Sequence, residues 1–450
     1  MDPTDDPRTT RKTRTRRSVL GTTAALAAVG LAGCSGDTGS GGGGGMATEE
    51  PTDTPTPTEE PTMEPTETAT EEPTETESMA APDVPILNYA LTLEHLENAF
   101  YREGLETFAD EELMEADALS AFDEAVRMEV PAYLETVGAH EAAHVSALSD
   151  TIEELGGTPV EEGEYDFGYE TPTEFLAVGM ALENTGVAAY AGAAPSVVNN
   201  DILAAAAGIH SVEARHAAFL NLVNGELPFP SGVDEATSMS EVPEVAGGFV
   251  TSEVDASRYE LADERPTPDR KAEDDTSDVD VLNYALTLEH LENAFYREGL
   301  ENFSEEQLMD AEALSEFGED VRTMVPEHLA TVGAHEAAHV TAIADTVEEL
   351  GGTPVEEAEY DFGYETPSEF LGVAKALENT GVAAYKGAAP TVSNDAVFRA
   401  ALGIHSVEAR HAAFLNELNA ASPFPNAVDE PLSMDEVTEI AGGFIVDSGY

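Results

Sequence analysis

The sequence predicts an all-α protein made of two tandem four-helix bundles. Three observations lead to this prediction: long segments with helical apolar periodicity, few alternating strand patterns, and one order of motifs that appears twice. The two copies are offset by 195 residues, so that Glu289 in the second copy corresponds to Glu94 in the first. We expect the first bundle over residues 83–250 and the second over 278–450, separated by a charged, proline-containing linker over 251–277.

The two copies are close duplicates. Residues 87–106 recur unchanged as 282–301, and residues 208–221 recur unchanged as 403–416. Each copy is long enough to bury a hydrophobic core of its own. The duplication therefore predicts either a covalent pseudo-dimer or two independent domains.

Local signals place the elements of the first copy in order. Long helices are expected over residues 84–106, 131–155, 172–192 and 200–224. Pro131 and Pro172 stand where a proline in the first helical turn is tolerated, and Gly156 ends the second helix. A weaker helix is expected over residues 110–126. The connection over residues 156–171 is long enough to cross the bundle from end to end.

Each copy carries acidic and histidine residues in the same four helical motifs. The motifs are Glu94, Glu141-x-x-His144, Glu183 and Glu213-x-x-His216 in the first copy, and Glu289, Glu336-x-x-His339, Glu378 and Glu408-x-x-His411 in the second. A Glu and a His three residues apart lie about 60° apart around a helix, so both can face one metal site. Four-helix bundles with dinuclear iron or manganese centres use this set of ligands.

The acidic residues of these motifs lie among apolar residues of the same helical face. Glu94, for example, shares its face with Leu87, Ala90 and Tyr101. Charged groups are almost never fully buried without a partner or a metal. One Glu-x-x-His motif arises often by chance, whereas four motifs in order and duplicated favour two dinuclear metal centres.

The net charge of the chain is −71, from 90 acidic and 19 basic residues. Such a surface repels nucleic acid and anionic membranes, so we expect no nucleic-acid partner. It remains soluble where salt screens its self-repulsion. This composition resembles that of proteins from salt-loving archaea.

The first 34 residues resemble a twin-arginine lipoprotein signal. Arg16 and Arg17 precede an apolar stretch over residues 21–33, which is too short to span a bilayer. The stretch ends at Leu31-Ala32-Gly33-Cys34, which resembles a lipoprotein cleavage box with Cys34 as the lipidated residue. The expected location is the cell surface, with a lipid on Cys34 anchoring the protein to the cytoplasmic membrane. The alternative is a soluble secreted protein with an incidental cysteine.

Residues 35–82 are rich in Gly, Thr, Pro and Glu, and they predict an unfolded stalk. Cys34 is the only cysteine in the chain. The folded part can therefore contain neither a disulfide nor a thiolate metal centre.

Taken together, these motifs resemble the ferritin-like superfamily, and in particular its exported, desiccation-related branch. The segment over residues 87–101 looks like the first helix of that branch. The resemblance covers nearly all of the chain after the stalk. It implies twelve metal ligands: Glu94, Glu141, His144, Glu183, Glu213 and His216 in the first copy, and Glu289, Glu336, His339, Glu378, Glu408 and His411 in the second.

Glu97 competes with Glu94 for the first ligand position. Glu94 precedes Tyr101 by seven residues, just as Glu183 precedes Tyr190, so internal symmetry favours Glu94. Glu97 and its counterpart Glu292 are then additional ligands or acids that support the ligands. The tyrosines Tyr101, Tyr190, Tyr296 and Tyr385 either hydrogen-bond to ligands, or pass electrons, or only fill the core.

Three further histidines of the first copy recur in the second: His95, His140 and His210 correspond to His290, His335 and His405. His140 and His210 could orient a carboxylate or bind metal transiently. We favour surface or helix-capping roles for both.

The resemblance implies redox chemistry at a carboxylate-bridged di-iron centre that reacts with O₂ or peroxide. Carboxylate and imidazole ligands also suit manganese, so a manganese catalase is one rival prediction. A second rival is a non-catalytic surface protein that binds metal or protects against drying and oxidants. Whether the protein is an enzyme stays open at this stage.

Overall fold

The computed structural model describes residues 81–242, 247–252, 256–261, 266, 268, 270 and 276–446. The expected signal segment, Cys34 and nearly all of the expected stalk lie outside these residues. Both repeats belong to one compact unit. None of the helices in the described part of the chain combines the length and the hydrophobicity that crossing a bilayer requires.

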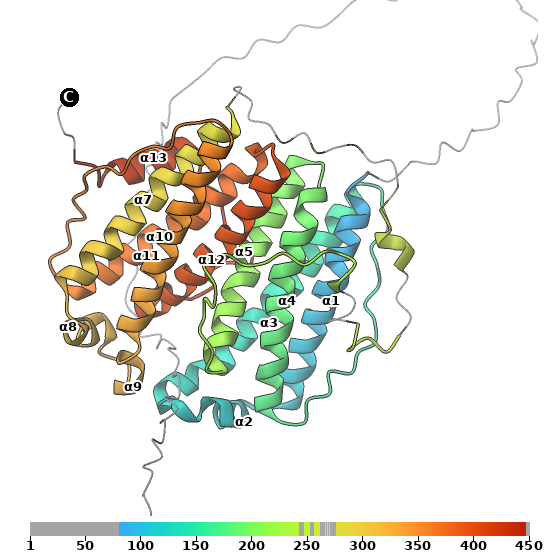
Figure 1. The fold of residues 1–450 in the computed structure, drawn as a ribbon. Helices are drawn as coiled ribbons and strands as arrows, with labels where there is room; N and C mark the ends of the chain where they lie inside the picture. Colours follow the sequence, from blue (N-terminus) through green and yellow to red (C-terminus); the bar gives the residue numbers. More distant parts are fainter. Residues whose placement is uncertain are drawn as a thin grey trace, which may run out of the picture. The chain divides into compact units, whose positions relative to one another are not determined.

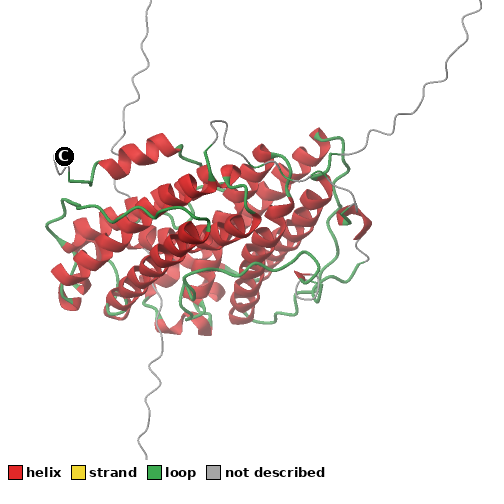
Figure 2. Ribbon diagram, turned by 45° about the horizontal axis from the view of Figure 1, so that its top comes forward, coloured by secondary structure: helices red, strands yellow, loops and turns green. Residues whose placement is uncertain are grey.

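The fold is all-α, as predicted (Figures 1 and 2). The long helices of the first repeat are α1 (Val84–Thr107), α3 (Glu124–Glu154), α4 (Pro172–Ala193) and α5 (Asn200–Val223). Those of the second are α7 (Asp278–Asn302), α10 (Val325–Glu349), α11 (Pro367–Ala388) and α12 (Asp395–Leu418). Shorter α-helices are α2 (Asp110–Met114), α8 (Glu305–Met309), α9 (Glu319–Arg322) and α13 (Met434–Gly442). Among the described residues, β-structure is limited to the isolated bridges Tyr165–Val250 and Tyr360–Ile445.

Side-chain caps and glycines set the ends of the main helices. Thr171 accepts a hydrogen bond from the backbone N–H of Glu174, whose carboxylate reaches back to Thr171, so α4 begins with a capping box. Asn199 caps α5 in a similar way by accepting from the first backbone N–H groups of that helix. Gly156 follows α3 with a φ of 76°, which glycine adopts without steric cost.

The prediction that α3 begins at Pro131 is wrong. Helix α3 begins at Glu124, because Asp123 caps it by accepting from the backbone N–H of Val126, and Pro131 lies inside the helix. The counterpart of Asp123 in the second repeat is Gly318, which has no side chain to cap with. There the helix is interrupted, and Pro326 stands in the first turn of α10.

The weaker helix expected over residues 110–126 is also different in the structure. Only α2 and a 3₁₀ segment over Asp117–Ala121 form between α1 and α3. The connection over residues 156–171 carries Phe167 and Tyr169 against Phe100 of α1, with ring centroids 5.2 and 5.8 Å from that of Phe100. These contacts cover the outer face of α1.

The two repeats pack against each other through α5 and α12, which lie side by side in Figure 1. Small residues form a cluster at this contact: Val187, Ala214, Ala217, Val382, Ala409 and Ala412. Small side chains allow the backbones of two helices to approach closely. The repeats are therefore packed as an intramolecular pair rather than as separate domains.

Candidate metal centre

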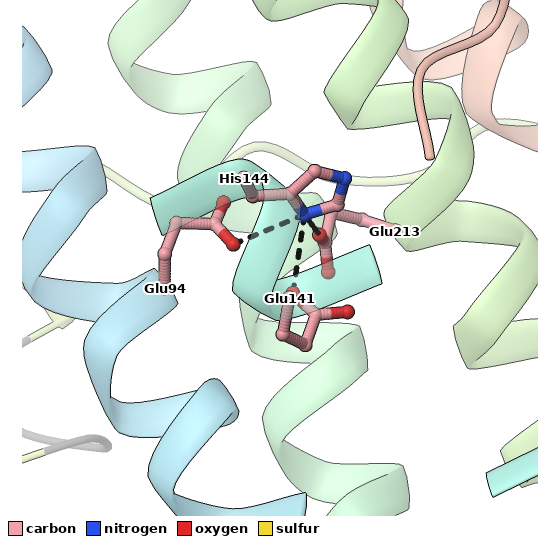
Figure 3. A group of neighbouring side chains, drawn as sticks. All are labelled: Glu94, Glu141, His144 and Glu213. Atoms are coloured by element: carbon pink, nitrogen blue, oxygen red, sulfur yellow. Dashed lines mark hydrogen bonds and ion pairs between the residues drawn. The ribbon is translucent and has the colours of Figure 1, made fainter. Parts of the chain in front are cut away.

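The motif residues of each repeat meet inside its bundle. In the first repeat all six ligand candidates are 0% exposed, and they come from α1, α3, α4 and α5. Ligand atoms of Glu94, Glu141, His144 and Glu213 lie within 4.8 Å of one another (Figure 3). A second such group contains Glu141, Glu183, Glu213 and His216. Two carboxylates, Glu141 and Glu213, belong to both groups.

The histidines present Nδ1 to the carboxylates. His144 Nδ1 lies 3.1 Å from Glu94 Oε2, 3.1 Å from Glu141 Oε2 and 3.2 Å from Glu213 Oε1 (Figure 3). His216 Nδ1 lies 3.0 Å from Glu141 Oε1 and 3.3 Å from Glu183 Oε2. Glu141 thus directs one oxygen to each histidine, so it could offer a donor atom to each of two neighbouring metal ions.

The second repeat reproduces this geometry. His339 Nδ1 lies 3.1 Å from Glu289, 3.2 Å from Glu336 and 3.1 Å from Glu408. His411 Nδ1 lies 3.1 Å from Glu336 and 3.2 Å from Glu378. The corresponding groups of four are Glu289, Glu336, His339 and Glu408, and Glu336, Glu378, Glu408 and His411.

The four tyrosines donate hydrogen bonds to the carboxylates that belong to only one group. In the first repeat, the Tyr190 hydroxyl donates to Glu94 and the Tyr101 hydroxyl donates to Glu183. In the second, Tyr296 donates to Glu378 over 2.5 Å and Tyr385 donates to Glu289. In each bundle, the tyrosine on the first long helix thus donates to the carboxylate on the third, and the tyrosine on the third donates to the carboxylate on the first. Of the three roles considered for these tyrosines, the structure shows hydrogen bonding to the ligand candidates.

Glu97 is buried but lies outside both groups of four. Its place depends on Gly186, where a Cβ atom would lie 3.0 Å from both Glu97 Oε1 and Glu213 Oε2. Glu292 and Gly381 repeat the arrangement, with distances of 3.2 Å to Glu292 and 3.1 Å to Glu408. Each additional acid therefore borders the shared carboxylate of its centre.

The buried charges of the first centre shift one another's pKa values. Burial raises the pKa of Glu94 to about 7, although His144 opposes the shift. Burial, together with the nearby acids, raises the pKa values of Glu97 and Glu213 well above the ordinary value. Burial alone would raise the pKa of Glu141, but His144 and His216 outweigh it and lower that pKa. The site thus combines ionised and protonated acids.

The neighbouring acids raise the pKa values of the two ligand histidines. Burial alone would lower the pKa of His144, but Glu94 and Glu141 outweigh it and raise that pKa well above the ordinary value. Glu183 and Glu141 likewise overcome burial and raise the pKa of His216 to about 9. The nearby acids thus favour the doubly protonated form of both imidazoles when no metal is bound. Metal binding would displace these protons.

The donor set fits a pair of divalent metal ions. Several buried polar atoms of the first centre make no hydrogen bond of good geometry, although some lie within 3.3 Å of an oppositely charged group: Glu97 Oε2, Glu141 Oε1, Glu183 Oε2, both carboxylate oxygens of Glu213, and His216 Nδ1. Such atoms are rare in folded proteins because desolvation is costly, and five of these six belong to residues of the two groups of four. Oxygen and imidazole donors suit iron, manganese and zinc.

His140 and His210 do not occupy the surface positions that we favoured. His140 is buried, and its Nδ1 lies 3.1 Å from Nε2 of His216, so it contacts a ligand histidine rather than a carboxylate. Burial, with His216 and His144 nearby, lowers the pKa of His140 to about 4. His210 is also buried and faces His405 of the other repeat, with ring centroids 5.7 Å apart. Helical periodicity did not show that a second repeat covers this face.

Sequence reasoning missed two backbone carbonyls that belong to the site. His144 Nε2 donates to the carbonyl of Ala427 over 2.6 Å, and His339 Nε2 donates to the carbonyl of Gly232 over 2.6 Å. Each carbonyl comes from the opposite repeat. The only available signal was the recurrence of Pro-Phe-Pro-x-x-Val-Asp at 228–234 and 423–429, which does not reveal where those segments pack.

Comparison with known families supports the same assignment. The ferritin-like domain family matches the chain twice, over residues 82–226 and 277–421. These matches cover more than half of the chain, so the protein belongs to the ferritin-like domain family. A comparison with curated proteins gives no match. The protein thus contains two tandem ferritin-like domains, each with buried Glu and His residues that could bind metal.

Proposed function

We propose that each repeat binds two iron ions and that the protein oxidises Fe(II) at these centres with O₂ or peroxide. The observation that carries this proposal is the sharing of Glu141 and Glu213 between two groups of four ligand candidates. A carboxylate shared in this way could serve both ions of a metal pair, as in the di-iron carboxylate bundles. Glu336 and Glu408 play the same part in the second repeat.

A bound iron pair would supply the electrons that reduce O₂ or peroxide. The residues of the chain position the pair and shield it. His144 and His216 offer Nδ1, while hydrogen bonds from Tyr190 and Tyr101 fix the orientation of Glu94 and Glu183. We propose that these phenols also carry electrons to or from the centre, because each donates a hydrogen bond directly to a ligand candidate.

We propose that an apolar pocket beside the second centre admits a small reactant. An apolar pocket between α7, α10, α11 and α12 is lined by Leu288, Ile343 and Tyr385, among others. Tyr385 donates to Glu289, so the pocket reaches a residue that contacts the centre. O₂ is small and apolar and matches such a lining.

Metal analysis combined with turnover assays tests the proposal. Purified protein reconstituted in high salt should bind about four iron ions per chain, because each repeat offers a full dinuclear ligand set. It should then oxidise added Fe(II) or consume peroxide. A saturating content of one ion or none per repeat would exclude dinuclear centres.

The same experiment separates the rival functions. Full metal binding without turnover would leave a metal-binding protein that acts without catalysis. Peroxide disproportionation with manganese, and none with iron, would identify a manganese catalase instead. Fe(II) oxidation with bound iron supports the proposed oxidase.

We further propose that the protein is exported by the twin-arginine route and anchored to the membrane through a lipid on Cys34. The support is the sequence alone: Arg16 and Arg17, the apolar stretch over 21–33 and the single cysteine that follows it. Cys34→Ser should release the protein from membranes or block its processing, whereas Ser35→Ala should change neither. Full retention of the Cys34→Ser protein on membranes would contradict the lipid anchor.

A further inference from the structure

Two segments of identical length leave their own repeat and lie over the metal centre of the other. We call residues 228–234 the first strap and residues 423–429 the second strap. They share the sequence pattern Pro-Phe-Pro-x-x-Val-Asp. Each follows the last long helix of its repeat, α5 for the first strap and α12 for the second.

The second strap contacts both ligand histidines of the first centre. The carbonyl of Ala427 accepts the 2.6 Å hydrogen bond from His144 Nε2. The ring of Phe424 stands at 81° to the ring of His216, with centroids 5.1 Å apart. Phe424 also packs against His140, which itself contacts His216. One short segment thus fixes the outer edges of both imidazoles.

A buried ion pair between the repeats holds the second strap in place. Arg215, which precedes the ligand candidate His216 on α5, donates from Nε to Asp429 Oδ2 over 2.8 Å. Both side chains are almost fully buried, at 2% and 8% exposed. The backbone N–H of Asp429 also donates to the carbonyl of Gly208 over 3.2 Å. Removing Asp429 would leave the charge of Arg215 buried and uncompensated, so its loss should displace the strap.

The first strap makes the same contacts with the second centre. The Gly232 carbonyl accepts from His339 Nε2 over 2.6 Å, and Phe229 packs on His411 with ring centroids 5.0 Å apart. Arg410 Nε donates to Asp234 Oδ2 over 2.8 Å. Two sets of independent contacts therefore give one reciprocal arrangement.

We propose that each strap positions the metal ligands of the opposite repeat, so that each centre is complete only when both repeats are present. A carbonyl can only accept a hydrogen bond, so it keeps the proton of His144 on Nε2 and leaves the Nδ1 lone pair for metal. The same bond fixes the plane of the imidazole. This inference rests on the proposed metal binding. It adds that the residues supporting the ligands of each centre come from the opposite repeat.

The metal affinity of each centre should therefore depend on the strap of the opposite repeat, which contacts it, and not on the strap of its own repeat. Asp429 is far from the first centre in sequence, yet its loss should loosen the strap that supports His144. Substituting residues that support a metal ligand typically costs about 10–100-fold in affinity. Asp234, which lies in the first repeat, should have no such effect on the first centre.

A full-length protein with only one working centre allows this dependence to be measured. In the His339→Ala/His411→Ala background the second centre loses both imidazoles, and titration with Co²⁺ reports the first centre through its visible absorption. Into this background we would introduce either Asp429→Asn or the matched control Asp234→Asn. Circular dichroism in high salt would check that each variant is folded.

We expect Asp429→Asn to weaken Co²⁺ binding by about 10-fold or more, with a changed absorption spectrum, and Asp234→Asn to leave both unchanged. Equal Co²⁺ affinity in the two variants, or a larger loss with Asp234→Asn, would overturn the inference. If the background protein itself binds no Co²⁺, the proposed metal binding fails, so the two failures are distinguishable.

A second variant covers the case in which Asp429→Asn does not fold. Phe424→Leu keeps an apolar side chain in the strap but removes the ring that packs on His216, and its matched control is Phe229→Leu. We expect Phe424→Leu alone to weaken Co²⁺ binding at the first centre. Equal affinity in these two proteins would likewise contradict the role of the straps.

Discussion

The combined substitution His144→Ala and His339→Ala should abolish oxidation chemistry in both repeats while leaving most of the helix content intact. His144 Nδ1 lies within 3.2 Å of an oxygen of Glu94, Glu141 and Glu213, so alanine removes the only nitrogen from that group of four. Loss of a residue that only supports a ligand already costs about 10–100-fold in metal affinity. Loss of the ligand itself should exceed about 100-fold, or about 3 kcal/mol of binding free energy.

The two substitutions should lower the free energy of unfolding by less than the loss of buried ion pairs would suggest. Breaking a buried ion pair commonly costs about 3–5 kcal/mol, because an uncompensated charge stays behind. Here the acids can take up protons instead, since the pKa of Glu94 is already about 7. The free energy of unfolding should therefore fall less at pH 6 than at pH 8.

The assays are Fe(II) oxidation, peroxide loss and metal titration, beside circular dichroism in high salt. His95→Ala with His290→Ala is the matched control, because it removes the same atoms from the residues next to Glu94 and Glu289. His95 Nε2 lies 3.2 Å from the carbonyl of Val160, and His290 Nε2 lies 3.1 Å from that of Val355, so neither bonds to its centre. Unchanged turnover per bound metal in the folded His144/His339 variant would show that these histidines are not ligands.

Two further predictions follow from buried groups. Burial raises the pKa of Glu94 to about 7, and Glu183 raises that of His216 to about 9 against burial, so both stabilise the metal-free protein below their unfolded-state pKa values. The Glu94 contribution is lost as pH rises from 4.5 to about 7, and the His216 contribution is lost as pH rises from 6.5 to about 9. The melting temperature of metal-free protein should therefore fall across this whole range while metal affinity rises; a flat melting profile would contradict this. Gly104→Ala should destabilise the fold by about 1–3 kcal/mol, because a Cβ there would lie 2.0 Å from the Phe175 ring. Gly372→Ala, whose nearest neighbour is 3.8 Å away, should be neutral or stabilising in the same denaturant titration.

Local patterns made the fold class predictable. A helix can be predicted from the spacing of its apolar residues and from caps such as Thr171. These signals are local, because each involves residues only a few positions apart. The ligand candidates were predictable for a related reason. Glu141 and His144 are three residues apart on one helix, and the order of the four motifs is complete in the linear sequence.

The start of α3 shows where local reasoning failed. Pro131 is compatible with a first helical turn, but α3 begins at Glu124 and continues through the proline. In the second repeat the matching turn, α9, also begins at the equivalent residue Glu319, without a side-chain cap, and the helix breaks only before Pro326. Whether the helix continues depends on the balance between the helical hydrogen bonds around the proline and the one that proline cannot make. A pattern of residue types does not rank the two.

Two duplicated helical bundles, their buried acids and their paired histidines were predictable from the sequence, because these features repeat within single helices. The tertiary structure alone decided what surrounds them: the tyrosines that cross to the opposite helix, the burial of His140, and the carbonyls of Ala427 and Gly232 on the ligand histidines. These contacts join residues far apart in the chain, up to 283 positions for His144 and Ala427. Backbone carbonyls are common to all residues, so only the packing of one repeat on the other selects which of them reach a metal centre.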